Sequence, residues 1–374
     1  MIKSVLGDED LFAMRTSREV MAMEDEVYRA LAEYLDRMPI GAPMSEELLD
    51  ILRILFTPEE AELAVRLPAF NTSLEDIAKM TGMQEDRLGE MLDTMASKGT
   101  VFKSVKEGTA RYRLLPTLVG FSETPFWPGK DNERVRKLAP LWIRYLFTSW
   151  GKEIADRDVP LVRAVPVGED IAPTSRVLPF ETAKELVEDA AYLAVAYCPC
   201  RQMKAYVGEG CDHERENCFH FGSMGRYIVE QGMGRELDLE EASQKLEEAH
   251  EAGLVFTVDN YQGRISTLCC CCKCCCVFLQ SRNLMGMDNA VAPSSYVARV
   301  DRESCVGCGE CEERCPAGAV ALDEHEVARV DTEQCLGCGV CVPNCTGEAI
   351  ALGRREEATN VPTLEEFLAS FTPK

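Results

Sequence analysis

Apolar residues in the first third of the chain recur at the three- and four-residue intervals of helices. Between Ser17 and Met38 they occupy Val20, Met23, Val27, Leu31, Tyr34 and Leu35, which predicts an amphipathic helix. The same periodicity predicts further helices over Glu46–Leu55, Thr57–Arg66, Ser73–Thr81 and Glu85–Lys98. A hairpin is then predicted over Val101–Leu115, with Gly108 at its tip.

The order of these elements in residues 45–116 resembles a winged helix-turn-helix domain, and that resemblance implies DNA binding. The charges argue against this function, because a DNA-reading helix needs a basic face toward the phosphates. In the helix that would read DNA, acidic residues outnumber basic ones: Glu85, Asp86, Glu90 and Asp93 stand against Arg87 and Lys98. The hairpin adds Lys103, Lys106, Arg111 and Arg113, which does not reverse the balance. We therefore expect a protein-docking or architectural role for this domain.

Strand and helix patterns alternate in the middle of the chain. The apolar runs Ala191–Tyr197 and Leu254–Asp259 predict buried strands. Helices are predicted from Ser223 to about Gly232 and from Asp238, as N-cap, to His250. Near the end, Thr363–Glu366 matches a capping box and predicts a short tail helix. These patterns favour an α+β protein with several domains.

Length and composition are those of an ordinary globular protein. The chain has 374 residues, which suggests two or three domains, with 46% hydrophobic and 28% charged residues. The sequence holds no apolar run of about 18 residues, so no membrane span is expected. The N-terminus lacks the apolar stretch of a secretory signal, so we expect a cytoplasmic protein. The net charge of −23 also disfavours binding to nucleic-acid phosphates.

Nineteen cysteines, none before Cys198, are the most informative feature of the sequence. In a long chain without a secretory signal they favour metal or cluster ligands over a disulfide framework. Eight of them repeat the spacing C-x2-C-x2-C-x3-C: Cys305, Cys308, Cys311 and Cys315, then Cys335, Cys338, Cys341 and Cys345. This is the spacing of bacterial ferredoxins that hold two [4Fe-4S] clusters. A pair of zinc ribbons is the competing interpretation, since C-x2-C also binds zinc.

The sequence around these eight cysteines is itself repeated. Val297–Asp301 recurs as Val327–Asp331, and Ala319–Leu322 recurs as Ala349–Leu352, so each half predicts strand, loop, short helix and strand. The resemblance to two-cluster ferredoxins implies two ligand sets: Cys305, Cys308, Cys311 and Cys345 for one cluster, and Cys335, Cys338, Cys341 and Cys315 for the other. One departure is Thr346, which stands where a proline is expected after the last cysteine.

A second group of cysteines follows the predicted strand at residues 191–197. It consists of Cys198, Cys200, Cys211 and Cys218. Four thiols on one loop can converge on a single metal centre, and Arg201 would offset its negative charge. His213 and His220 are candidate ligands too, although we expect both to be solvated, and we expect His250 at the surface.

The third group is the run from Cys269 to Cys276, in which Lys273 is the only residue that is not cysteine. In an extended strand, neighbouring side chains point to opposite faces. One face would then hold Cys270, Cys272, Cys274 and Cys276, and the other Cys269, Cys271 and Cys275. The run therefore suggests two centres on either side or one of unusual shape, with these candidate ligands: Cys269, Cys271, Cys272, Cys274 and Cys275. Its cysteine doublets resemble those of heterodisulfide-reductase-type proteins, which hold non-cubane clusters, but Lys273 and Val277 replace the glycine found there.

Taken together, the cysteine motifs resemble those of multi-cluster iron–sulfur proteins of strict anaerobes over about residues 160–350. We expect a winged-helix-like N-terminal domain with its leading helix in residues 1–120 and an α/β Cys-rich cluster-binding domain in 121–290. A ferredoxin-like domain with two [4Fe-4S] clusters is expected in 291–353, and a docking tail in 354–374.

This resemblance implies two [4Fe-4S] clusters in the ferredoxin-like domain and one or two further clusters upstream. The expected function is an electron-transfer subunit that serves a redox partner protein or an oxidoreductase complex in anaerobic metabolism. Two alternatives stay open. One is a reductase with a non-cubane site at the Cys269–Cys276 run, acting on a disulfide or another substrate. The other is a redox-sensing winged-helix regulator.

Overall fold

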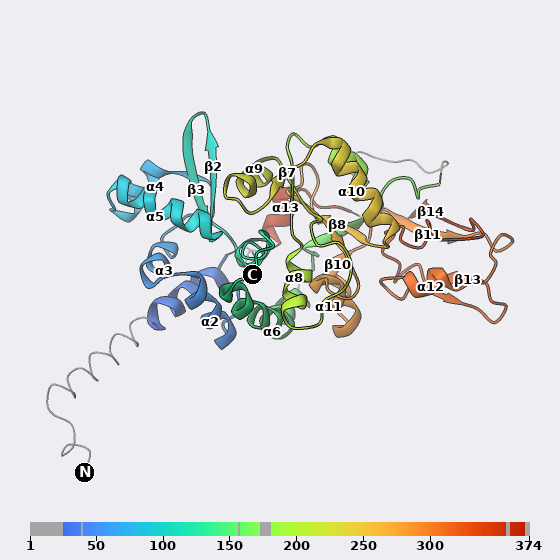
Figure 1. The fold of residues 1–374 in the computed structure, drawn as a ribbon. Helices are drawn as coiled ribbons and strands as arrows, with labels where there is room; N and C mark the ends of the chain where they lie inside the picture. Colours follow the sequence, from blue (N-terminus) through green and yellow to red (C-terminus); the bar gives the residue numbers. More distant parts are fainter. Residues whose placement is uncertain (1–24, 39, 156–157, 173–180, 357–359, 371–374) are drawn as a thin grey trace, which may run out of the picture. The chain divides into compact units, whose positions relative to one another are not determined.

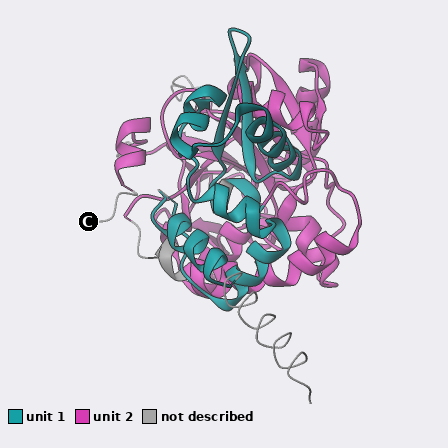
Figure 2. Cartoon of the chain, turned by 90° about the vertical axis from the view of Figure 1, so that its left-hand side faces the viewer, with its two compact units in different colours: residues 1–122 teal, residues 123–374 magenta. Residues whose placement is uncertain are grey.

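The computed structural model describes residues 25–38, 40–155, 158–172, 181–356 and 360–370 (Figure 1). The chain divides into two compact units, residues 1–122 and 123–374, which Figure 2 shows in different colours. Residues 25–36 are helical, whereas the start of the predicted N-terminal helix, residues 17–24, lies outside the described residues. In the described parts of the chain, no helix is both long and apolar enough to cross a bilayer.

In unit 1, helices precede a β-hairpin. The helices are α2 (Glu46–Leu55), α3 (Pro58–Ala64), α4 (Leu74–Thr81) and α5 (Glu85–Lys98). The hairpin strands β2 (Val101–Lys106) and β3 (Thr109–Leu114) form a sheet with the short β1 (Thr72–Ser73), in the order β1-β3-β2. Glu107 and Gly108 turn the hairpin with positive φ, as two-residue turns require. The predicted helices and hairpin tip are thus confirmed.

Reciprocal hydrogen bonds begin helix α3. The Thr57 hydroxyl accepts a bond from the Glu60 N–H at 3.2 Å, and the Glu60 carboxylate accepts one from the Thr57 N–H at 2.9 Å. Glu60 is buried and also binds Lys98 of α5, with an N–O distance of 2.6 Å. These bonds satisfy N–H groups that a helix start leaves without intrahelical partners, and they connect α3 to α5.

A seven-stranded sheet forms the centre of unit 2, in the order β10-β4-β8-β9-β6-β5-β7. Neighbouring strands are antiparallel apart from β10 and β4, which are parallel. The strands are β4 (Val162–Val165), β5 (Leu193–Ala196), β6 (Cys218–Phe221), β7 (Arg235–Glu236), β8 (Val255–Asp259), β9 (Thr267–Cys271) and β10 (Val291–Ala292). The predicted strands at 191–197 and 254–259 are therefore confirmed.

Helices accompany this sheet: α6 (Glu133–Ala155), α7 (Ala183–Glu188), α8 (Pro199–Tyr206), α9 (Gly222–Glu230), α10 (Leu239–Glu251) and α11 (Val277–Met285). Apolar residues of α7 and α10 pack with Phe219, Phe256 and Leu268 of the strands in one buried cluster. Side chains alternate between the two faces of a strand, so Cys218 and Cys269 lie on the face opposite to Phe219 and Leu268. As predicted, Asp238 caps α10.

The C-terminal repeat forms two small antiparallel sheets (Figure 1, orange). In one, β11 (Tyr296–Val300) pairs with β14 (Ile350–Arg354), and in the other, β12 (Val320–Leu322) pairs with β13 (Ala328–Val330). The first strand of the repeat therefore pairs with the last, which closes the two halves around a shared core. Helix α12 (Glu310–Arg314) lies in the first half, and the tail helix α13 (Leu364–Ala369) begins with the predicted capping box.

Replacing Thr57 by alanine tests the start of α3. The variant removes the side-chain acceptor for the Glu60 N–H, so we expect the free energy of unfolding of unit 1 to fall by about 1 kcal/mol. Hydrogen exchange of the α3 amides measures this change. Thr363→Ala, which removes the corresponding cap of α13 in unit 2, is the matched control and should leave α3 exchange unchanged. Equal exchange of α3 in the two variants would contradict the assignment.

Candidate metal centres

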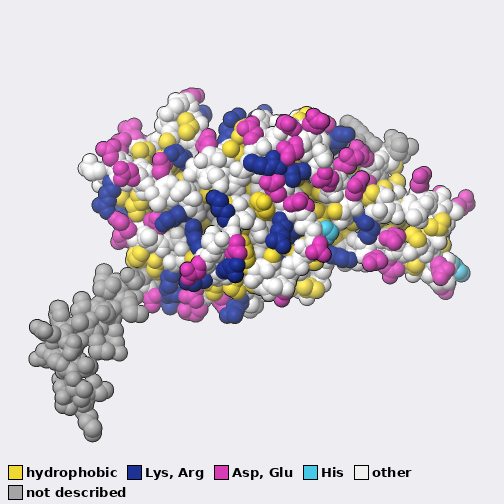
Figure 3. All heavy atoms as spheres, in the orientation of Figure 1, with side chains coloured by type: hydrophobic (Ala, Val, Ile, Leu, Met, Phe, Trp, Pro, Cys, Tyr) yellow, Lys and Arg dark blue, Asp and Glu magenta, His cyan; other side chains and the backbone are white. Residues whose placement is uncertain are grey.

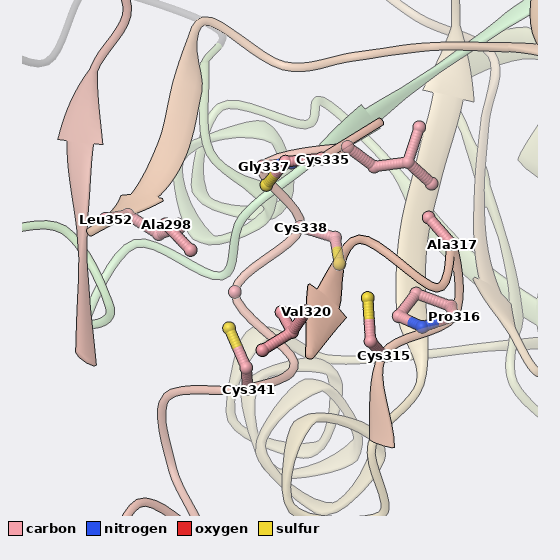
Figure 4. Close-up of a pocket in the computed structure, with 12 residues that line it drawn as sticks. Ala298, Cys315, Pro316, Ala317, Val320, Cys335, Gly337, Cys338, Cys341 and Leu352 are labelled. Carbon is pink, nitrogen blue, oxygen red and sulfur yellow. The ribbon is translucent and has the colours of Figure 1, made fainter. Parts of the chain in front are cut away.

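Four cysteines of the C-terminal repeat surround one cavity. Cys315, Cys335, Cys338 and Cys341 line it, together with apolar groups such as Val320. Figure 4 shows the four sulfurs around the same space. Cys315 comes from the first half of the repeat and the other three from the second, so the cavity forms only when the two halves fold together.

A second cavity mirrors the first. It is lined by Cys305, Cys308, Cys311 and Cys345. Here three cysteines come from the first half and the fourth, Cys345, from the second. The structure thus brings together the two sets of four cysteines that the resemblance to two-cluster ferredoxins implied.

Hydrogen-bond donors of the backbone point at the sulfurs of both cavities. The N–H of Ala319 donates to Cys315, and that of Ala349 to Cys345, each at 3.2 Å. Further bonds run from Gly337 to Cys335 at 3.4 Å and from Ala328 to Cys305 at 3.5 Å. Thr346, the residue in place of the expected proline, has its hydroxyl 3.7 Å from the Cys308 sulfur. Such donors stabilise a sulfur that carries negative charge.

Two glycines let the chain pass close to the first cavity. Gly337 and Gly339 have φ values of 63° and 83°, in the left-handed region that favours glycine. A Cβ atom at Gly337 would collide with the Tyr296 carbonyl oxygen, and one at Gly339 with the Asp170 carboxylate. Side chains are thus excluded here by sterics as well as by backbone conformation.

A family model for a 4Fe-4S dicluster domain matches residues 298–352. The C-terminal part of this chain is a 4Fe-4S dicluster domain. No curated protein and no solved structure matches the chain. A domain of this kind implies iron–sulfur electron transfer, and the matched residues contain both cysteine-lined cavities.

The residues of the two cavities fit iron–sulfur clusters. Burial raises the pKa of Cys338 to about 12, and it also raises the pKa values of Cys341 and Cys311. A thiolate at such a position is costly without a cation, and cluster iron supplies one. Each cavity offers four convergent sulfurs, one for each iron of a cubane.

Six cysteines upstream of the dicluster domain form a second group, which we call the six-cysteine set: Cys198, Cys200, Cys218, Cys269, Cys271 and Cys276. Their sulfurs form an unbroken series of side-chain contacts, from Cys198 to Cys200, Cys276, Cys271, Cys269 and Cys218. Sheet register creates part of this set, because Cys218 on β6 lies directly opposite Cys269 on β9. The hydrogen bond with Cys269 lowers the pKa of Cys218 to about 6.

Several groups around the six-cysteine set can stabilise negatively charged sulfur, although hydrogen bonds with neighbouring thiols and burial raise the pKa values of Cys198, Cys269 and Cys276. Cys198 and Cys276 are the N-cap residues of α8 and α11, where helix dipoles present their positive ends. The Thr257 hydroxyl lies 3.3 Å from the Cys271 sulfur, and the His220 Nε2 lies 3.4 Å from the Cys218 sulfur. The set can therefore hold a metal centre.

Another four cysteines form the four-cysteine set: Cys211, Cys272, Cys274 and Cys275. All four sulfurs lie within 4.8 Å of one another. Cys272 and Cys275 are buried and Cys211 is half-buried, while Cys274 is exposed. The hydrogen bond with Cys275 lowers the pKa of Cys272 to about 4, whereas burial raises that of Cys274 to about 12.

Arg201 lies between the two sets. Its side chain is 1% exposed and donates to the Glu214 and Cys270 carbonyl oxygens and to the Asn217 side chain, at 2.7 to 2.8 Å. Burial lowers its pKa, but the charges of Cys198 and other nearby thiols outweigh this effect and raise it above its ordinary value. Arg201 is therefore positioned to offset thiolate charge.

Two expectations about the upstream cysteines are wrong. The first is that Cys211 shares a centre with Cys198, Cys200 and Cys218, since its sulfur contacts the Cys269–Cys276 run instead. The second is the strict alternation of faces along that run. Strand β9 ends at Cys271, and a turn over residues 273–275 follows, so Cys276 joins Cys271 and Cys200.

Cys270, His220 and His250 are buried. The Cys270 side chain lies in the apolar cluster with α10, as do those of Cys272 and Cys275, but its sulfur belongs to neither set. His220 is fully buried, with its ring 4.5 Å from that of Trp127, so the expectation of a solvated residue is wrong. His250 is also buried rather than at the surface, and its Nε2 lies 3.1 Å from the Asp170 carboxylate. Sequence patterns missed both because strand pairing and tertiary contacts bury them.

Gly337→Ala tests the close backbone approach at the first cavity. The added Cβ would collide with the Tyr296 carbonyl, so we expect loss of about half of the iron bound by the dicluster domain. Iron analysis of the purified protein measures this. Gly318→Ala is the matched control, because Gly318 has a similar φ of 62° but open space around its Cβ position. An equal effect of both substitutions would show that φ alone, and not the close approach, makes Gly337 necessary.

Proposed function

We propose that this chain is an electron-transfer protein with three iron–sulfur centres. Two are [4Fe-4S] clusters in the dicluster domain, with Cys305, Cys308, Cys311 and Cys345 binding one, and Cys335, Cys338, Cys341 and Cys315 binding the other. The six-cysteine set binds a third, upstream centre. Electrons move between these centres and a partner oxidoreductase. The observation that carries this proposal is the direct connection of the six-cysteine set to the dicluster domain by helix α11.

Helix α11 begins at the six-cysteine set and ends at the dicluster domain. Its N-cap is Cys276, and near its other end the Arg282 guanidinium donates to the Gln334 carbonyl at 3.1 Å. The Asn283 side chain donates to the Pro316 carbonyl at 2.5 Å. Gln334 and Pro316 are the immediate neighbours of two cysteines of the first cavity, Cys335 and Cys315. Seven residues of helix span roughly 10 Å, so α11 holds the two sites at a short, fixed separation.

Further hydrogen bonds attach the dicluster domain to the sheet domain. The Lys273 ammonium, inside the cysteine run, donates to the Glu313 carbonyl at 2.6 Å. The Arg314 guanidinium donates to the Glu251 carbonyl at 3.0 Å. Both acceptors lie at helix ends, where carbonyl groups lack intrahelical partners. These bonds restrict movement of the domain relative to the six-cysteine set.

Burial favours a carrier over a substrate-reducing site at the six-cysteine set. Cys218, Cys271 and Cys276 are buried, and Cys198, Cys200 and Cys269 are half-buried. Catalysis on a disulfide would need a sulfur or iron that the substrate can reach. Of the six sulfurs, all of which the structure describes, none belongs to an exposed residue.

The charge of the surface indicates the kind of partner. Asp and Glu side chains are spread over the face shown in Figure 3, including the dicluster domain at its right-hand end. Together with the net charge of −23, this favours a partner with a basic docking face, because complementary charges speed association.

For unit 1, we infer a winged-helix-like domain that docks proteins rather than DNA. The helix order and the three-stranded sheet support the fold. Several of its basic side chains already bind carboxylates: Lys98 binds Glu60, Lys103 binds Asp93, and Arg87 binds Glu59. Such pairing leaves less positive charge for phosphates.

Anaerobic purification of the full chain tests the proposed function. We expect brown protein with iron and acid-labile sulfide in similar amounts, reversible bleaching by dithionite, and EPR signals from the reduced state. Co-purifying chains identify the partner. Colourless protein, or zinc in the dicluster domain, would overturn the proposal. Disulfide reduction by the isolated chain would instead favour the catalytic alternative.

Lys273→Ala tests the attachment of the dicluster domain. The variant loses one solvent-exposed, charge-assisted hydrogen bond, worth about 1 kcal/mol. We expect faster hydrogen exchange in residues 310–316 and slower electron equilibration between the dicluster and upstream centres. Lys184→Ala, which removes a surface contact with Glu169, is the control. If the two variants exchange at the same rate in 310–316, Lys273 does not hold the domain.

A further inference from the structure

The four-cysteine set differs in geometry from the other cysteine sites. The Cys211 sulfur lies 3.6 Å from that of Cys275 and 4.0 Å from that of Cys272, and the Cys274 and Cys275 sulfurs are 3.9 Å apart. All four sulfurs lie within 4.8 Å of one another.

These distances match four ligands on one metal ion. A tetrahedral zinc ion with Zn–S bonds of about 2.3 Å places its sulfurs about 3.8 Å apart. A [4Fe-4S] cube holds its terminal sulfurs further apart, because each thiolate binds a different iron. The dicluster domain provides an internal comparison. Among the described residues, the four-cysteine set is the only group of three or more Cys, His, Asp or Glu ligand atoms this close together, so the two dicluster sets are more open.

We propose that Cys211, Cys272, Cys274 and Cys275 bind a single Zn²⁺ ion through four thiolates. The site is closed, since all four tetrahedral positions are taken by protein sulfur, as in structural zinc sites. It goes beyond the electron-transfer function and does not depend on it.

The neighbouring charge suits such a centre. Zinc with four thiolates carries a net charge of −2, which needs a nearby cation if it is partly buried. The buried Arg201 guanidinium contacts the Cys272 sulfur, and its own position is fixed by the Cys270 carbonyl at 2.7 Å. Ligands of metal sites are commonly oriented by such neighbours.

The proposed ion would hold two distant segments together. Cys211 belongs to the polar loop between α8 and β6, and it meets Cys272 across 61 residues of sequence. The other ligands surround Lys273 in the turn between β9 and α11. Zinc at this place would fix that turn, and with it the Lys273 contact to Glu313 of the dicluster domain.

Metal analysis and zinc K-edge X-ray absorption of the anaerobically purified full chain test the proposal. We expect one zinc per chain, with about four sulfur neighbours at about 2.3 Å and no second metal nearby. Cys274→Ala should remove the zinc and leave iron and sulfide unchanged. Cys270→Ala is the matched control from the same run, because the Cys270 sulfur is not one of the four that lie within 4.8 Å of one another, and this variant should retain zinc.

Two results would overturn the proposal: wild-type protein without stoichiometric zinc, or loss of iron and sulfide rather than zinc in Cys274→Ala. The absorption spectrum of wild-type protein shows whether four sulfurs bind one zinc ion, even if the variants fold poorly. Failure of the electron-transfer proposal is seen separately, as absence of iron from the dicluster domain in the same preparation.

Discussion

Negatively charged sulfur inside a protein needs a positive counterpart. Unit 2 places hydrogen-bond donors and positive charge next to its clustered sulfurs. Desolvation makes an isolated buried charge costly, so clustered thiols either stay protonated or bind cations. Burial is the main cause that raises the pKa values of Cys270 and Cys338. Where sulfurs converge, the fold adds donors and positive charge: backbone N–H groups in the dicluster domain, helix N-termini at Cys198 and Cys276, and the Arg201 guanidinium.

Strand pairing in the sheet brings the upstream cysteines together, whereas short loops bring together most cysteines of the dicluster domain. In that domain, three cysteines of each cavity lie within a few residues of one another and need little tertiary structure to meet. Upstream, Cys218 and Cys269 are far apart in the chain and meet because β6 and β9 are paired in this register. A shift of one residue would move one of them to the apolar face. The six-cysteine set therefore depends on the whole sheet, and the apolar cluster under α10 that secures the register also secures the site.

This difference explains how far the sequence could predict the sites. The resemblance of the last eight cysteines to those of two-cluster ferredoxins implied both groups of four, and helix periodicity predicted α2, α4, α5 and α10 closely. The division of the other cysteines between the six-cysteine set and the four-cysteine set could not be predicted, since it depends on which strands pair and on where β9 ends. The burial of His220 and His250 was missed for the same reason: His220 lies in strand β6 and His250 in helix α10, and each is covered by residues distant in sequence.

The end of β9 is the point where one run of cysteines becomes two sites. Up to Cys271 the backbone is extended and sulfurs alternate between faces. Beyond it, the Cys276 N–H donates to the Cys272 carbonyl at 3.1 Å, which closes a single turn before α11 begins. That turn gathers the sulfurs of residues 272, 274 and 275 on one side and returns the Cys276 sulfur to the side of Cys271. Adjacent cysteines can thus serve different centres without distortion, because a change of secondary structure, rather than spacing, separates them. Lys273 occupies the turn itself, so the same backbone feature that divides the cysteines also supplies the contact to the dicluster domain.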